Sequence, residues 1–267
     1  MIMTSTMSTS DSNSAENADF QKLLGISEEK QHSSSKRGSS EDSLFDFSHI
    51  ASDVRLHLTK VYLCLTTLIA VASYGCYLQQ TTDISQWLAS ALMVCSFCGI
   101  LFSKGSSKLL RMTLLLTFGF FTGIMLGDVV GTAADIDPQL VLTAFMATCS
   151  IFACFTIASL LCKERSALYL GSTLSTALIV LSLIGAVNMV TDIPLLHSVY
   201  LYVGLVVFTA YIVYDTQMIV QKAERGDKDF AAHTVDLFLD FVSVFVRILV
   251  LLTEKKSSSR KKSKNEQ

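Results

Sequence analysis

Six long apolar runs, and a weaker seventh, follow one another along this 267-residue chain and are separated by short polar turns. With edges uncertain by about 2–4 residues, the runs lie at 58–79, 85–103, 109–131, 139–161, 167–190, 196–220 and 234–252. Most are long enough to cross a hydrocarbon core of about 30 Å at about 1.5 Å per residue. A water-soluble core cannot bury so many such runs, so the sequence predicts an all-α polytopic membrane protein with six to seven transmembrane helices.

The charged residues, 16% of the chain, are concentrated outside these runs. Residues 1–50 are rich in Ser, carry scattered acids and hold few large apolar side chains, which predicts a disordered tail. We therefore divide the chain into this tail, a transmembrane helical domain at 51–253, and a basic C-terminal tail at 254–267. The basic tail contains Lys255, Lys256, Arg260, Lys261, Lys262 and Lys264.

Lys and Arg alternate between the connections, and this alternation predicts the orientation. The flank before the first run and the second, fourth and sixth connections are basic: Arg55, Lys60, Lys104, Lys108, Arg111, Lys163, Arg165, Lys222, Arg225 and Lys228. The first, third and fifth connections carry only acids: Asp83, Asp135, Asp137 and Asp192. The pattern predicts a cytosolic N-terminus, cytosolic even connections and six full crossings.

The last run, 234–252, does not fit the alternation, because basic residues flank it on both sides. Two alternatives remain for it. It dips into the membrane and returns, which orientation rules favour, or it crosses as a seventh helix held by its neighbours. Irregular backbone at membrane depth is tolerated only inside protein or beside water. In both alternatives the segment is expected at the centre of the bundle.

Three carboxylates interrupt the last two apolar runs: Asp215, Asp236 and Asp240. An ionised carboxylate at the bilayer centre costs about 2.5–3.5 kcal/mol on insertion scales, so these acids must protonate, share a proton, meet a cation or face water. Asp236 and Asp240 are four residues apart and share one helix face, with Arg247 two turns further along nearly the same face. The short turn between the runs lets Asp215 face them across a hairpin.

Two carboxylates at contact distance cannot both ionise cheaply and titrate as a unit. The protonated pair is a hydrogen-bonded latch between helices, and the deprotonated pair repels and offers oxygen ligands suited to Ca²⁺. The residues alone therefore predict proton-gated cation permeation through these acids, with Asp236 and Arg247 among the pore or ion-binding candidates. The alternative is that Asp215 is merely solvated at a cytosolic helix end.

A further acid, Asp128, lies near the non-cytosolic end of the third run. It is either a mouth residue that attracts cations or a simple interfacial acid. With Asp135 and Asp137 it makes an acidic outer face that raises the local cation concentration. In the same run Gly119, Gly123, Gly127 and Gly131 recur at every fourth position, a stripe that predicts close helix packing.

The sequence offers no support for an enzyme. The seven cysteines fall in or beside apolar runs, and the pair at Cys95 and Cys98 has no second pair, so membrane packing is preferred over metal or redox work. His57, His197 and His233 lack metal-ligand spacing. We expect no cofactor, with Ca²⁺ and H⁺ as the permeating or regulating ions, and nothing indicates nucleic acid as a partner.

The motifs around the acids resemble those of the Bax inhibitor-1 family, also called the transmembrane Bax inhibitor motif family. They are FSHI (47–50), TAFMATCSIFACFT (143–156), LYVGLVV (201–207), YDTQMIVQKAERGDKDF (214–230) and HTVDLFLDFVSVF (233–245). One departure concerns the third run, where close relatives carry Gly-Pro and an acid one turn later. Here Gly127 is followed by Asp128, which suggests that the acid has moved by one helical turn.

The resemblance implies a membrane protein of the endoplasmic reticulum that suppresses cell death and conducts Ca²⁺ in a pH-dependent way, lowering lumenal Ca²⁺. It implies a seven-helix bundle whose di-aspartyl pH sensor matches Asp215 and Asp240, which would form the gate and hold Ca²⁺ transiently. It also implies a lysine-rich tail that matches 255–264. It further implies anti-apoptotic Bcl-2-type proteins and the stress sensor kinase-nuclease of the endoplasmic reticulum as partners. Ca²⁺/H⁺ exchange through the same acids, and a non-conducting interaction protein, remain as alternatives.

Overall fold

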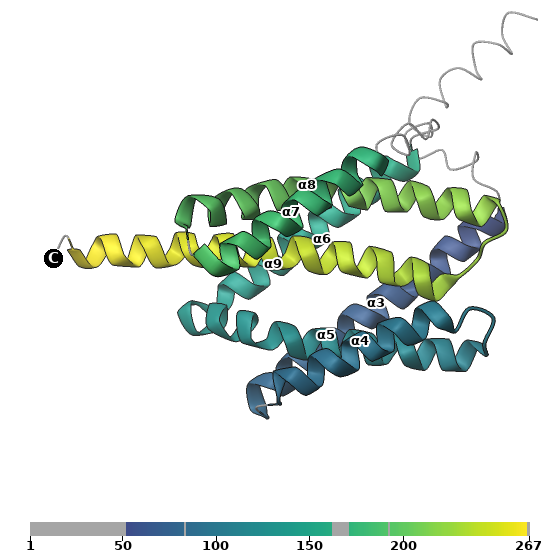
Figure 1. Ribbon diagram of the computed structural model, residues 1–267, viewed down its shortest axis with the longest axis horizontal. Coiled ribbons are helices and arrows are strands. Elements are labelled where there is room, and N and C mark those ends of the chain that lie inside the picture. The colour runs from purple at the N-terminus through teal and green to yellow at the C-terminus, as the bar shows by residue number, and fades with distance from the viewer. Residues whose placement is uncertain (1–51, 83, 162–170, 192, 266–267) are drawn as a thin grey trace, which may run out of the picture. The chain divides into compact units, whose positions relative to one another are not determined.

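The computed structural model describes residues 52–82, 84–161, 171–191 and 193–265, with side chains up to Arg260. These residues form helices joined by short connections (Figure 1): α3 Ser52–Thr81, α4 Gln86–Phe102, α5 Lys108–Ile136, α6 Pro138–Leu161, α7 Gly171–Thr191, α8 Pro194–Glu224 and α9 Phe230–Asn265. Five of them, α3 and α5 to α8, are long and apolar enough to cross a membrane, and α4 is a shorter apolar helix. The prediction of an all-α polytopic membrane bundle is confirmed.

Some predictions fall on residues outside the described ranges. They concern the N-terminal tail at 1–50, the FSHI motif, the connection charges at Asp83, Lys163, Arg165 and Asp192, and the side chains of Lys261, Lys262 and Lys264. The division into 1–50, 51–253 and 254–267 also stays a prediction. The helix backbone continues through residue 254, because α9 runs to Asn265.

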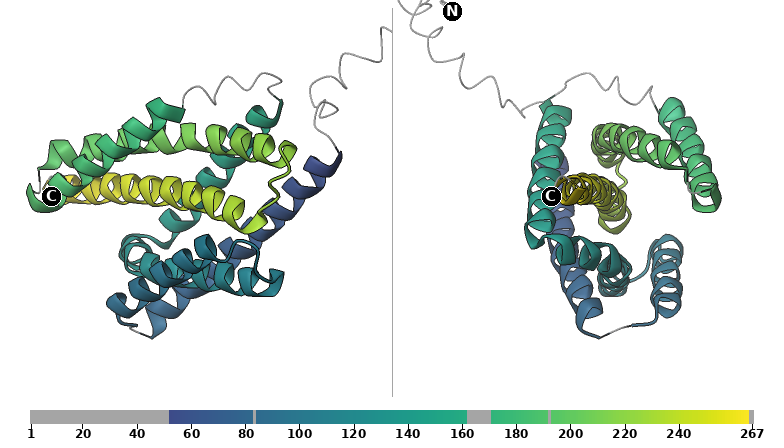
Figure 2. Two further views of the ribbon diagram at one scale, coloured as in Figure 1. Left: turned by 45° about the vertical axis from the view of Figure 1, so that its right-hand side comes forward. Right: turned by 90° about the vertical axis from the view of Figure 1, so that its left-hand side faces the viewer.

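The last segment lies at the centre of the bundle, as expected. α9 packs against α3, α5, α6 and α8, and it is seen end-on between them in the right-hand view of Figure 2. Its buried side chains point to several sides at once, including Leu237, Phe238, Val244 and Leu249. Protein therefore covers most of its apolar surface. Of the two alternatives for this segment, the structure has the continuous helix and not the dip and return.

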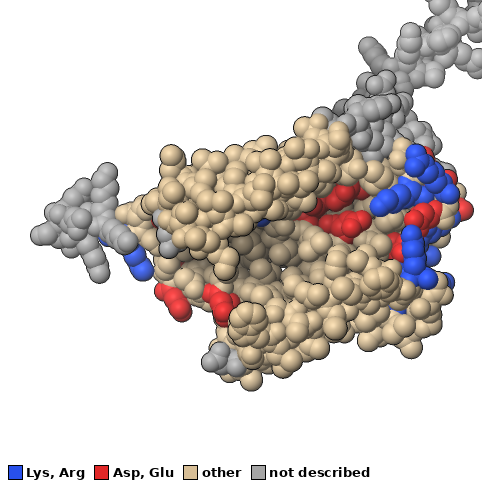
Figure 3. Space-filling model, in the orientation of Figure 1, with Lys and Arg blue, Asp and Glu red and all other residues tan. Residues whose placement is uncertain are grey.

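The two ends of the bundle are best named by their connections. The near end holds the α4–α5 and α8–α9 turns, and the far end holds the α5–α6 and α7–α8 connections. α9 begins at the near end and reaches the far end, where Lys256 lies 3.0 Å from the carboxylate of Asp137 and Glu254 lies 2.8 Å from His197. Charged side chains gather at both ends, with an apolar wall between them (Figure 3).

The glycine stripe of α5 is a packing face, as predicted. A Cβ atom at Gly119 would overlap Leu68 of α3, one at Gly123 would overlap the carbonyl oxygen of Ala72, and Gly127 lies against Gln79. Gly131, the last member of the stripe, has no comparably close neighbour. The missing side chains let the backbones of α3 and α5 approach closely, which is how helices associate without a hydrophobic driving force between them.

Candidate functional site

The α8–α9 turn fixes how the two acid-bearing helices face each other. α8 ends at Glu224, and Gly226 adopts φ +93°, a left-handed conformation that glycine takes without steric cost. The backbone N–H of Asp227 donates to the carbonyl of Lys222 at 3.0 Å, which closes the helix end. Asp229 then caps α9, because its side chain accepts from the backbone N–H of Ala232 at 3.2 Å. The chain reverses within five residues, so α8 and α9 run antiparallel.

This hairpin brings Asp215 of α8 and Asp240 of α9 together. Asp240 is 4% exposed and Asp215 is half-buried, and their carboxyl groups are within hydrogen-bonding reach of each other. An ionised carboxylate can only accept hydrogen bonds, so this contact requires one of the two groups to carry a proton. The other oxygen of Asp240, Oδ2, has no partner among the described residues. The arrangement is a shared-proton pair between two helices.

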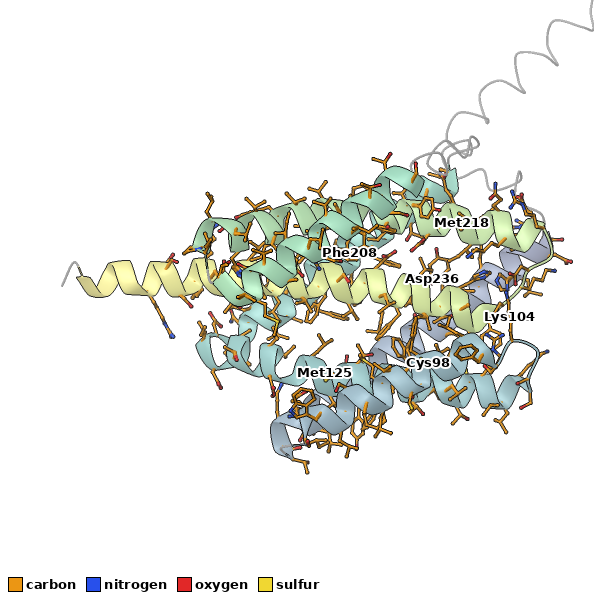
Figure 4. The ribbon with its side chains drawn as sticks, in the orientation of Figure 1. Cys98, Lys104, Met125, Phe208, Met218 and Asp236 are labelled. Atoms are coloured by element: carbon orange, nitrogen blue, oxygen red, sulfur yellow. The ribbon has the colours of Figure 1, made fainter. Side chains whose placement is uncertain are left out.

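Asp236 extends this cluster toward the near end. It lies one turn before Asp240 on the same face of α9, is half-buried, and is close enough to Asp215 and Asp240 to repel both electrostatically. Figure 4 shows it on α9 in the space between α8 and α4, and Figure 3 shows carboxylates inside a hollow of the apolar wall. Lys222, in the last turn of α8, counteracts the negative charge of Asp215 and Asp236.

Arg247 lies apart from the carboxylates and makes no ion pair with any of the described ones. It is 8% exposed; its guanidinium donates to the carbonyl of Ser243 at 3.0 Å and to the hydroxyl of Tyr200 at 3.4 Å. It also lies over the ring of Phe208, 4.4 Å from the centroid, a favourable cation–π geometry. A Cβ atom at Gly204 would overlap it. The structure therefore places Arg247 against α8 and not within the acid cluster.

Asp128 is also separate from the carboxyl pair. It is exposed at the far end, where it accepts a hydrogen bond from Gln86 Nε2 at 2.9 Å. At the same end, Asp137 is paired with Lys256 of the basic tail, and the hydrogen bond from Lys256 holds the pKa of the Asp137 carboxyl below its usual value. The far end thus combines the acidic outer face with the first basic residues of the tail. The sequence did not predict the pairing of Lys256 with Asp137, because it left the course of residues 234–252 through the membrane undecided.

The near end contains a buried ion pair that the sequence did not reveal. Nη2 of Arg111, at the start of α5, lies 2.6 Å from Oδ1 and 2.8 Å from Oδ2 of Asp229. Both side chains are more than nine-tenths buried. Burial alone raises the pKa of Asp229, but the hydrogen bonds from Arg111 and from the Ala232 N–H outweigh it and lower this pKa below its ordinary value. In the sequence both residues belong to polar connections, where charged side chains are usually solvated.

Two histidines meet beside this ion pair. Nε2 of His57 in α3 lies 3.0 Å from Nδ1 of His233 in α9, and both residues are buried. The two histidines are 176 positions apart in the sequence, so no local spacing could have predicted their contact. In the described part of the chain no three His, Cys, Asp or Glu side chains are arranged to hold a metal. The pair instead ties the start of α3 to the start of α9.

Comparison with known proteins gives one consistent result. A family model described as "Inhibitor of apoptosis-promoting Bax1" matches residues 54–257. Bax inhibitor 1 of Homo sapiens is 37% identical over 228 residues, which cover 84% of this chain and 96% of that protein. Bax inhibitor 1 of Bos taurus is 37% identical over 227 residues, covering 83% and 95%. Bax inhibitor 1 of Arabidopsis thaliana is 35% identical over 217 residues, covering 81% and 88%.

Proposed function

Because the chain belongs to the Bax inhibitor 1 family, membrane proteins that suppress cell death, we propose that it acts as a pH-sensitive Ca²⁺ leak channel gated by Asp215 and Asp240. The single observation that carries this proposal is the contact of two carboxyl groups inside the bundle, between α8 and the central helix α9. The protein has no enzymatic activity in this proposal. It resides in the endoplasmic reticulum membrane with its N-terminus in the cytosol, and it lowers lumenal Ca²⁺.

The gate works through the proton that the pair shares. While the proton is present, a hydrogen bond joins Asp215 to Asp240 and holds α8 against α9. When it leaves, two negative charges face each other in a site of low dielectric, where their repulsion is strong. The helices then separate, and the carboxylate oxygens become available to a hard cation. Asp236 adds a third carboxylate on the near-end side, along the path that a cation would take.

The test is Ca²⁺ flux into proteoliposomes containing the full-length protein, measured across pH. Wild type is compared with Asp215→Asn and Asp240→Asn, which keep the size and hydrogen-bonding capacity of the side chains but cannot exchange a proton. Asp53→Asn serves as the matched control, since that carboxylate lies in the first turn of α3, is exposed and does not belong to the pair. We expect pH-dependent flux in wild type and in the control, and flux without pH dependence in both pair variants. Folded wild-type protein that passes no Ca²⁺ would contradict the proposal.

Ca²⁺/H⁺ exchange is a second candidate, because a cation that binds between Asp215 and Asp240 would displace the proton they share. Counting protons in the same proteoliposomes separates the two mechanisms. Exchange releases protons in fixed proportion to the Ca²⁺ taken up, whereas a leak moves Ca²⁺ with no such coupling.

A non-conducting role is favoured by the C-terminal extension of α9, which carries the exposed Lys255 and Arg260 beyond the last crossing. In this alternative the tail and the spans bind anti-apoptotic Bcl-2-type proteins and the endoplasmic reticulum stress sensor. Removing residues 254–267 distinguishes this interaction role from the channel role. Loss of protection from cell death with Ca²⁺ flux unchanged would favour the interaction role.

A further inference from the structure

A cavity of about 450 Å³ lies between α3 and α6 and is walled at the back by α5 and α9. α3 packs against α5, and α6 packs against α8. α3 and α6 lie on the same side of α9 but stand apart from each other over most of their described lengths (Figure 2). The lining is almost entirely apolar, with Ile69, Leu126, Phe241 and Phe245 among its side chains. A volume of this size is typical of sites that bind small apolar ligands, for which about 300–1,000 Å³ is usual.

The cavity opens sideways toward the surface that the bilayer covers. Tyr77 of α3 and Leu142 of α6 line it and are themselves 63% and 64% exposed. Tyr74 and Met146, on the same two helices, continue the exposed apolar surface beyond the opening. An apolar cavity with such an opening is in contact with lipid chains and not with water.

Its length matches one leaflet. Along α3 the lining runs from Ile69 to Gln80, which is about 16 Å at 1.5 Å per residue. Half of a hydrocarbon core of about 30 Å is about 15 Å. The lining ends at Gln80 and Pro138, and Pro138 directly follows Asp137, which is paired with Lys256. The cavity therefore runs from the polar far end of the bundle to the middle of the membrane.

From this opening, length and lining, we propose that the cavity binds an acyl chain of a phospholipid from the far-end leaflet. The chain inserts between α3 and α6 along the phenylalanines of α9 that line the cavity, and its headgroup stays at the level of Lys256. The occupant is a bilayer lipid and not a dissolved molecule, since the opening faces the lipid.

This site shares a wall with the carboxyl pair. Phe238, Phe241 and Phe245 recur at helical spacing on α9 and form the floor of the cavity. At about 100° per residue, Asp236 and Asp240 lie on the opposite side of the same helix. A bound acyl chain thus packs against the back of the helix that carries the carboxylates. The proposal goes beyond the ion-channel function, and binding at the site does not depend on ion flux.

The test uses the full chain in nanodiscs of phospholipid with brominated acyl chains, which quench tryptophan fluorescence on contact. The protein has a single tryptophan, Trp87, which is replaced by Phe. Phe245→Trp then places a reporter at the cavity floor, and Phe118→Trp is the matched control, buried against Phe97 and Phe238 but outside the cavity lining. We expect the reporter at 245 to lose most of its fluorescence in brominated lipid while the reporter at 118 keeps its fluorescence.

A second pair of variants tests occupancy directly. Ser73→Phe adds a ring inside the cavity and should restore the fluorescence at position 245. Ser150→Phe is the matched control: Ser150 is also an exposed serine bonded to the carbonyl four residues earlier, on α6, but it is not part of the lining. If Phe245→Trp does not fold, Val242→Trp, half-buried in the same lining, replaces it.

Two results would overturn the proposal. One is equal fluorescence loss at positions 245 and 118. The other is quenching at 245 by brominated fatty acid added to ordinary phospholipid, together with no quenching by brominated phospholipid, since the occupant would then be a free fatty acid. Ca²⁺ flux is not the readout, so failure of the channel proposal would leave this result interpretable.

Discussion

The α8–α9 hairpin carries two buried charge contacts of opposite kind. At the near end, Arg111 and Asp229 form an ion pair that joins the start of α5 to the start of α9. Further along the same hairpin, Asp215 and Asp240 place two acids against each other. The first contact joins opposite charges and is complete as it stands. The second joins two acidic groups and exists only while they share a proton.

This difference separates a permanent contact from a switchable one. The Arg111–Asp229 pair stays ionised around neutral pH, because the pKa of Asp229 is already below its ordinary value. The Asp215–Asp240 contact loses its hydrogen bond when the shared proton leaves. α9 is thus anchored at its first turn and releasable two to three turns later. Such an arrangement lets the middle of a central helix move without detaching its start.

Breaking the permanent contact should have the largest effect. Asp229→Ala leaves the Arg111 guanidinium buried without its partner, and breaking a buried ion pair from one side costs about 3–5 kcal/mol. We expect this loss in the free energy of unfolding, measured by denaturant titration in detergent. Lys104→Ala is the control, since the Lys104–Asp227 pair is exposed and such pairs contribute about 0–1 kcal/mol. Equal losses in the two variants would mean that the Arg111–Asp229 pair is not an anchor.

Acid should remove the same anchor. A carboxyl whose pKa is lowered by folding contributes stability that is present above its unfolded-state pKa and is lost as pH falls through its folded-state pKa. For Asp229 the ordinary value is 3.8, so the contribution is complete at neutral pH and decreases below about pH 4. The stability gap between wild type and Asp229→Asn should therefore be constant from pH 7 to about pH 5 and shrink in stronger acid. A gap that grows on acidification would contradict this sign.

Arg247 is a further buried charge on α9. It forms no ion pair with a described residue and shares no proton, and its side chain occupies the space that Gly204 leaves free. Gly204→Ala places a methyl group where the Arg247 side chain lies, and such overpacking costs about 1–3 kcal/mol. Gly131→Ala is the control, because the nearest atom to its added Cβ would be 3.9 Å away. Thermal unfolding of both variants in detergent checks the expectation. An unchanged melting temperature for Gly204→Ala would show that Arg247 moves aside freely.

Removing the switch should have the smallest effect on stability. Asp240→Asn replaces one member of the shared-proton pair by a neutral group of similar shape that can still bond Asp215, so the free energy of unfolding at neutral pH should stay within about 1 kcal/mol of wild type. The same denaturant titration measures it, now beside Asp229→Asn. A loss as large as that of the anchor variant would assign Asp240 a structural role and remove the contrast between the two contacts.

The sequence predicted the scaffold well and the long-range contacts poorly. Hydropathy predicted each helix to within a few residues at most edges, because span length is set by the thickness of the bilayer. The short turn between two helices also made it predictable that Asp215 would face an acid of the next helix. That this acid is Asp240 followed from the family resemblance. Arg111 and Asp229, 118 residues apart, gave no such local signal.

The course of residues 234–252 was undecided for a physical reason. Charge on both flanks opposes a simple crossing, whereas the structure packs α9 as a continuous helix mainly against α3, α5, α6 and α8. The role of Gly204 was hidden as well, because a glycine in an apolar run looks like any packing glycine until Arg247 is placed beside it.

Infrared difference spectroscopy of the protein in lipid at neutral pH detects protonated carboxyl groups, so it tests directly whether Asp215 and Asp240 share a proton. We expect one such carboxyl in wild type and in Asp229→Asn, and its loss in both Asp215→Asn and Asp240→Asn. A wild-type spectrum without a protonated carboxyl, or a carboxyl signal that survives in both pair variants, would show that Asp215 and Asp240 do not share a proton and would leave the proposed gate without its switch.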